Sequence, residues 1–195
     1  MVVEKSLNRS IRRRLGLAVG VAALSLLSTS SMAAVVYSGA VNIPIPNNID
    51  GIYFNVVTGD ASPAPPAGWD LNPYSAVAGQ LNLWGESTTT WFSTGDINGS
   101  YLLANGTSID PTAVASFFRP GGNIVIPVTV NSSDNFLGFR FPNESAGGQL
   151  QAGWLQLQVG ATAGTRAIIA YAYEDTGQPI QVGTTPVTLQ NYTVD

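Results

Sequence analysis

From Val35 onward the chain alternates between short runs rich in Val, Ile, Phe, Tyr and Thr and clusters of Gly, Pro, Asn, Asp and Ser. Apolar and polar residues alternate within several runs, and turn residues recur roughly every 8 to 12 positions, which is typical of short antiparallel strands. No window in this part of the chain repeats with the period of an α-helix. The pattern predicts an all-β fold, an antiparallel β-sandwich or jelly roll of roughly ten strands.

The clearest single strand is expected over residues 123–131, where four aliphatic side chains share one face. Pro127 lies on the other face, and because proline has no amide proton to donate, it favours an edge strand or a bulge. The four aliphatic side chains are Ile124, Ile126, Val128 and Val130.

Three further strands follow in the second half of the chain. Residues 136–141 and 154–159 alternate as half-buried strands do, with Trp154 on the face opposite Leu155. Ala167 to Glu174 is apolar on both faces, which predicts a central strand covered on each side. Weaker patterns predict strands over residues 35–37, 41–45, 52–57, 81–84, 101–104 and 187–194.

The first 33 residues have the three zones of a secretory signal peptide: a basic start, an apolar run from Leu15 to Leu27, and small residues ending at Ala33. We expect cleavage after Ala33, leaving residues 34–195 as a single β-sandwich domain. The alternative, an uncut membrane anchor, is disfavoured because the apolar run is shorter than the roughly 20 residues that a spanning helix needs.

Removing this leader changes the charge of the protein. Five of the eight basic residues leave with it, so three arginines face eleven acids in residues 34–195, a net charge of −8. A chain of this sign repels nucleic-acid phosphates and anionic lipid head groups, so we expect neither nucleic-acid binding nor insertion into a membrane after cleavage. The expected location is secreted, extracellular or periplasmic, and the chain has no cysteine for disulfides there.

The strings GFRF, AGWLQLQV and AYAYEDTGQPIQVG, within Gly138 to Gly183, resemble a segment of secreted bacterial proteins of the PEP-CTERM type. The resemblance covers about a quarter of the chain and implies an exported, surface-destined β domain. It does not extend to the sorting tail of that group, since the chain stops at Asp195 without a Pro-Glu-Pro motif, an apolar span or a basic end.

Residues 34–195 contain no His, Cys or Lys. This excludes a Ser-His-Asp triad, a cysteine nucleophile and Schiff-base chemistry, and it removes the usual ligands of zinc and copper. We therefore assign no catalytic residue. A pair of carboxylates is sufficient for glycoside hydrolysis, and Glu86, Glu144 and Glu174 are the candidates, although such residues are more often solvated loop acids or, for Glu174, acceptors in a turn or partners of Arg140.

Trp69, Trp84 and Trp91 are candidates for a glycan-binding platform, because flat aromatic rings can stack on sugars; packing in the core is the alternative. Calcium is the ion that suits an oxygen-rich, acidic chain, and Asp96 and Asn98 are its candidate ligands. The same residue types are equally usual in tight turns. No other cofactor is expected.

Together these features favour a non-enzymatic extracellular or cell-surface protein of structural or adhesive type, whose partners are other extracellular copies or glycans. The alternative is a carbohydrate-binding, lectin-like module. A carboxylate-based glycoside hydrolase is a third hypothesis.

Overall fold

The computed structural model describes residues 34–186 except residues 87, 97, 121 and 123. The leader and the strand expected over residues 187–194 lie outside this part of the chain. The described residues are nearly all β, with two short 3₁₀ turns, η1 (Ala115–Phe117) and η2 (Glu144–Ala146). Among them, no helix has the length and apolar character needed to span a bilayer.

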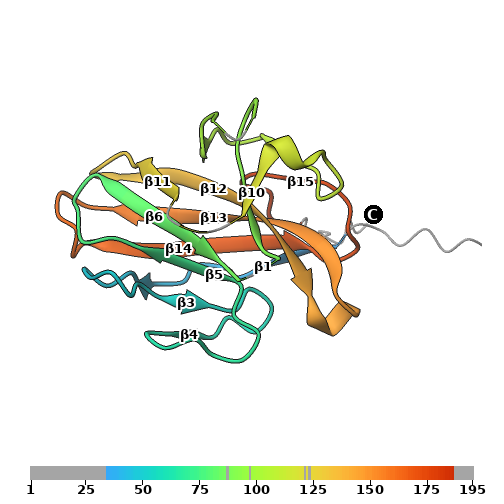
Figure 1. Cartoon of the computed structure of the whole chain (residues 1–195), viewed down its shortest axis with the longest axis horizontal. Coiled ribbons are helices and arrows are strands. Elements are labelled where there is room, and N and C mark those ends of the chain that lie inside the picture. Colours follow the sequence, from blue (N-terminus) through green and yellow to red (C-terminus); the bar gives the residue numbers. More distant parts are fainter. Residues whose placement is uncertain (1–33, 87, 97, 121, 123, 187–195) are drawn as a thin grey trace, which may run out of the picture. The chain divides into compact units, whose positions relative to one another are not determined.

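The larger sheet has eight strands and is built around a long antiparallel hairpin. In this hairpin β12 (Ser132–Asn143) pairs with β13 (Gln149–Val159), and β13 pairs in turn with β14 (Arg166–Glu174), so that the three run side by side (Figure 1). The shorter strands are β1 (Val35–Tyr37) and β2 (Ile43–Pro44), which pair with β14; β7 (Thr90–Phe92) and β8 (Leu102–Leu103), which pair with β12; and β10 (Phe118–Pro120), which pairs with β7.

A second sheet has five strands in the order β11-β6-β5-β3-β4, and two further strands form a small ribbon. All pairs are antiparallel, which confirms the predicted all-β, antiparallel architecture. The strands of the second sheet are β3 (Tyr53–Phe54), β4 (Ala61–Ser62), β5 (Leu71–Tyr74), β6 (Gln80–Gly85) and β11 (Ile124–Pro127); the ribbon pairs β9 (Ser108–Ile109) with β15 (Ile180–Gln181).

The main hydrophobic core contains side chains of both large sheets. Leu81 and Leu83 of β6 and Ile124 of β11 belong to the same buried cluster as Leu137 and Phe139 of β12. Because alternate residues of a strand point to opposite faces, each sheet contributes one face to this layer, as in a β-sandwich.

The opposite face of the larger sheet is covered as well. Trp154 of β13 and Ala172 of β14 are buried with Ile109 and Ile180 of the β9–β15 ribbon in a second apolar cluster. Strand β14 is therefore buried on both faces, as its unbroken apolar sequence predicted. Trp154 belongs to the core and is not a surface residue.

The strand predicted over residues 123–131 is shorter than expected. Pro127 does lie in an edge strand, since β11 ends the five-stranded sheet, but the strand stops there. The Asn135 side chain accepts a hydrogen bond from the Thr129 amide at 2.7 Å and donates one to its carbonyl at 2.9 Å. These bonds fix a turn beyond the strand, so Val130 is exposed rather than in the core.

Candidate functional site

Three aromatic side chains lie together on the five-stranded sheet, and we call them the aromatic face: Tyr53, Trp69 and Trp84. The Trp69 ring lies between the other two, with centroid distances of 4.9 Å to Tyr53 and 6.5 Å to Trp84, and both contacts are edge-to-face. Trp84 is 47% exposed, and Tyr53 and Trp69 are partly exposed. Ring pairs of this kind stabilise each other's orientation, so the aromatic face has a fixed geometry before any ligand arrives.

The strand register explains why these residues meet. Trp84 of β6 lies opposite Asn72 of β5, and β3, which carries Tyr53, pairs with the other edge of β5. The alternation in β6 directs Leu81 and Leu83 into the core and Trp84 outward. Trp69 comes from the loop that enters β5, so it can lie between side chains of β3 and β6, the two strands that flank β5.

Three carboxyl groups gather beside the aromatic face. Asp70 immediately precedes β5 and Glu86 immediately follows β6, and the Glu86 amide donates to the Asp70 carbonyl at 2.9 Å. Glu144 begins η2, the turn of the long hairpin, and its carboxyl carbon would lie 3.8 Å from a Cβ atom added at Gly68. The hairpin turn of one sheet thus places its acid against a loop of the other sheet.

Asp70 differs from its two neighbours because its side chain is buried, with only 2% exposed. Burial raises its pKa to about 7, with smaller upward contributions from the charges of Glu144 and Glu86, while the hydrogen bond from the Val56 amide opposes them. That bond is 2.8 Å long. Asp70 therefore stays protonated to a higher pH than an exposed aspartate, beside two more accessible acidic side chains.

The loop that leads from β3 to β5 is held by Asn55. Its side-chain amide donates to the Gly68 carbonyl at 2.5 Å, and its oxygen accepts from the Val57 and Thr58 amides. Because Asn55 is itself buried, these bonds fix both ends of the loop that positions Trp69 and Asp70. Neither Asn55 nor Asp70 can be distinguished in the sequence as a site residue, since an isolated Asn or Asp near glycines is typical of any turn.

Trp91 does not belong to the aromatic face, and its assignment to a sugar platform is corrected by the structure. Strand β7 lies between β10 and β12, and Trp91 has 0% exposure, packed edge-to-face with Phe139 at 6.4 Å. Its neighbours in sequence gave no sign of this, because the Ser-Thr-rich turn before β7 predicted a position at a rim.

Glu174 is also a structural residue. It is fully buried at the end of β14, where its carboxylate accepts from the Thr176 amide at 3.0 Å, the Thr176 hydroxyl at 2.5 Å and the Gln178 amide at 2.5 Å. This matches the alternative in which Glu174 accepts hydrogen bonds from a turn. A partnership with Arg140 is not formed: Arg140 donates to the Pro111 carbonyl and lies over the Phe118 ring.

Asp96 and Asn98, the candidate calcium ligands, lie in a tight loop. The Asp96 carboxylate accepts from the Asn98 amide at 2.7 Å, and the Asp96 carbonyl accepts from the Gly99 amide at 2.9 Å. These are the bonds of an Asx-type turn. Within the described part of the chain, no three or more His, Cys, Asp or Glu side chains gather in a way that would hold a metal ion.

Comparisons of the chain with protein-family models, with curated proteins and with solved structures gave no match. The resemblance of Gly138 to Gly183 to PEP-CTERM proteins stays a prediction. In the structure, several residues of that segment have packing roles. A Cβ atom added at Gly138 would lie 2.7 Å from Ile109 Cδ1, and Trp154, opposite Gly138, fills the second apolar cluster.

Proposed function

We propose that this protein is an exported, non-enzymatic adhesive protein that binds carbohydrate through its aromatic face. The observation that carries the proposal is the pairing of Trp69 with the half-exposed Trp84, supported on the other side by Tyr53. An indole ring offers a flat, polarisable surface against which the C–H groups of a pyranose ring pack.

The neighbouring acids suit a ligand rich in hydroxyl groups. Glu86 and Glu144 carry carboxylates, which only accept hydrogen bonds when ionised, and sugar hydroxyls are donors that fit them. With a net charge of −8 on residues 34–195, the chain favours a neutral glycan over an anionic one. Aromatic rings with a few polar groups at their margin are the usual composition of a small-ligand site.

The test is glycan-array binding of residues 34–195, followed by titration of the best neutral oligosaccharide. Trp84→Ala and Trp69→Ala should each weaken binding at least about tenfold, because each removes an aromatic ring on which the sugar packs. Val114→Ala is the matched control, since Val114 is an exposed apolar residue outside the aromatic face. Equal binding by all variants, or no binding to any glycan, would reject the proposal.

A second candidate function, glycoside hydrolysis, is favoured by one observation. Asp70, with a pKa of about 7, lies near the carboxylates of Glu86 and Glu144, and a carboxylic acid that donates a proton beside a carboxylate is the basic requirement for cleaving a glycosidic bond. Under this hypothesis Asp70→Asn and Glu144→Gln abolish sugar release while glycan binding persists. Binding without release from any oligosaccharide tested would eliminate the hydrolase and keep the binding protein.

A further inference from the structure

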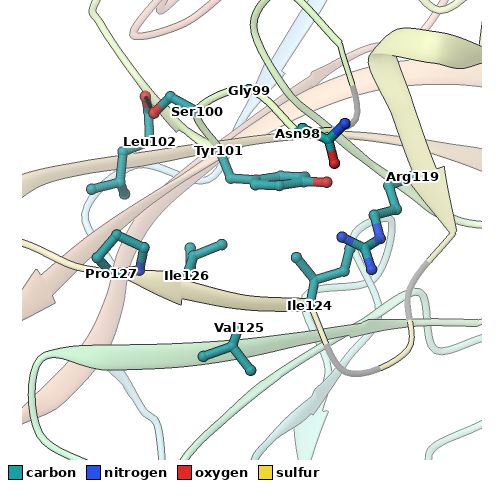
Figure 2. A pocket seen from close by; sticks show the side chains of 10 residues that line it. All are labelled: Asn98, Gly99, Ser100, Tyr101, Leu102, Arg119, Ile124, Val125, Ile126 and Pro127. Atoms are coloured by element: carbon teal, nitrogen blue, oxygen red, sulfur yellow. Dashed lines mark hydrogen bonds between the residues drawn. The ribbon is translucent and has the colours of Figure 1, made fainter.

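A pocket of about 540 Å³ lies where the edge strands of the two large sheets approach each other (Figure 2). One wall is β11, the last strand of the five-stranded sheet, and Arg119 enters from β10, the last strand of the eight-stranded sheet. The loop that carries Asn98 and Tyr101 closes the third side. The volume lies in the range of sites that bind small molecules.

The pocket has a polar end and an apolar end. The hydroxyl of Tyr101 points toward the side where the Asn98 amide and the Arg119 guanidinium lie, whereas Leu102 and Pro127 lie at the other side (Figure 2). On β11, Ile124 and Ile126 point toward Tyr101, whereas Val125 points to the opposite side of the strand (Figure 2). This arrangement fits a ligand that is anionic at one end and apolar at the other.

Arg119 is the arginine that the fold leaves available. Arg140 donates to the Pro111 carbonyl, and the buried Arg166 donates to three carbonyls, so both have structural partners. Arg119 is exposed, and no carboxylate of the described residues forms an ion pair with it. The part of the chain beyond the leader carries eleven acids against three arginines, so Arg119 is the cation at this pocket that can form charge-assisted hydrogen bonds with an anionic ligand.

The edge of β11 adds backbone groups to the same pocket. The Val128 amide donates to the Gly79 carbonyl, just before β6. In an antiparallel strand, the backbone groups of successive residues point alternately toward the paired strand and away from it. The backbone groups of Val125 and the carbonyl of Pro127 therefore point away from β6. Within the part of the chain that the structure describes, no strand pairs with the other edge of β11, so these groups can bond to a ligand.

We propose that this pocket binds a small carboxylic acid with an apolar body, the carboxylate on Arg119 and Asn98 and the hydrocarbon against Leu102, Ile126 and Pro127. A guanidinium donates two parallel hydrogen bonds to a carboxylate, which fixes the end of the ligand. The site shares no residue with the aromatic face, so the proposal is independent of carbohydrate binding.

Octanoate is the probe, titrated into residues 34–195 by calorimetry and by amide NMR, with 1-octanol as its uncharged counterpart. We expect octanoate to shift the amides of residues 98–102 and 124–126, and to bind at least about tenfold more tightly than 1-octanol. Arg119→Gln should weaken octanoate about 10- to 100-fold, the usual loss for a charge-assisted hydrogen bond, and leave 1-octanol unchanged. Because Arg119 is exposed, this variant should fold as the parent does.

Trp84→Ala is the second control and should leave octanoate binding unchanged. The proposal is overturned if Arg119→Gln binds octanoate as tightly as the parent, if 1-octanol binds equally well, or if the shifted amides lie elsewhere. Inorganic phosphate that displaces octanoate at equal concentration would also overturn it, since the site would then recognise charge alone. Loss of glycan binding in Trp84→Ala with octanoate binding intact would separate the two sites.

Discussion

The ring of Phe139 occupies the place where a side chain on Gly153 would lie. The two residues are directly opposite each other on β12 and β13, and a Cβ atom added at Gly153 would come within 2.5 Å of Phe139 Cζ and 2.7 Å of the Ala172 carbonyl oxygen. Phe139 is fully buried in the main core. A glycine is therefore required here by packing, in the middle of the sheet, and not by a turn.

We expect Gly153→Ala to lower the free energy of unfolding by about 1–3 kcal/mol, the usual cost of overpacking a core. Urea denaturation followed by tryptophan fluorescence measures it. Gly164→Ala is the matched control, since Gly164 is exposed and an added Cβ there meets nothing within 4 Å. A loss in Gly153→Ala no larger than in this control would contradict the packing argument.

Asp70 should make the protein less stable as the pH rises. Its pKa is about 7 in the folded state against 3.8 as the ordinary value, so between these values the folded state binds more protons than the unfolded state, and the free energy of unfolding falls with increasing pH. The loss attributable to this group between pH 4 and 8 is on the order of 4 kcal/mol.

Asp70→Asn removes this titration and keeps an oxygen that can accept from the Val56 amide. Denaturation at a series of pH values should show a flatter profile for Asp70→Asn than for the parent. Asp134→Asn, at an exposed carboxyl, serves as the control and should keep the profile of the parent. If the profile of Asp70→Asn keeps its full slope, another group is responsible.

Arg166 should act as an internal clamp. Its buried guanidinium donates to the carbonyls of Ala163 at 2.8 Å, Gln80 at 2.9 Å and Ser75 at 2.5 Å, which ties the start of β14 to the segment before β6. Arg166→Met leaves three carbonyls without their donors, and we expect a loss of about 3 kcal/mol or more. Arg166→Lys should recover only part, because an ammonium group lacks the planar fork.

Hydrogen exchange checks where this loss occurs. Amides of residues 75–80 should lose protection in Arg166→Met before the hairpin of β12 and β13 does, since the acceptors of the guanidinium, the carbonyls of Ser75, Gln80 and Ala163, lie outside that hairpin. Arg119→Gln is the control, because it removes an exposed arginine instead. A uniform loss of protection across the sheets would argue against a local clamp.

The tryptophans should divide into accessible and inaccessible ones. Trp84→Ala should remove much of the fluorescence that acrylamide quenches and change the free energy of unfolding by less than about 1 kcal/mol, because half of this side chain is already in water. Trp91→Ala should cost about 3–5 kcal/mol, the usual cost of a large cavity. Similar costs for the two variants would contradict the assignment of Trp91 to the core.

Much of the larger sheet could be predicted from residue order alone. The alternation of Leu137, Phe139 and Phe141 identified β12, and the unbroken apolar run identified β14 as a strand with both faces covered. Strand β5 could not be predicted in this way, because Asn72 and Pro73 are residues that strands disfavour and they interrupt the apolar pattern of a buried strand. Asn72 can be buried because its side-chain amide donates to the Asp50 carbonyl at 2.9 Å. That partner is 22 positions away in the sequence, so the local pattern does not show it.

The candidate site was only partly accessible to such reasoning. The chemistry of Trp69, Trp84, Glu86 and Glu144 marks them as candidates, and the structure places all four near Asp70. Glu174 has the same chemistry as the other two glutamates, but its carboxylate accepts hydrogen bonds within a turn. The sequence does not distinguish a carboxylate at a binding site from one that closes a turn, because the difference lies in the hydrogen-bond donors that the fold places around it.

The sequence by itself determined the all-β class, the charge beyond the expected leader and the absence of His, Cys and Lys there, because periodicity and composition are properties of residue order. The tertiary structure alone decided that Trp84 faces water while Trp91 is buried, and that the pKa of Asp70 rises. A period of two gives every strand two faces, but which face is covered depends on the sheet that packs against it, and a pKa depends on how much water that packing removes.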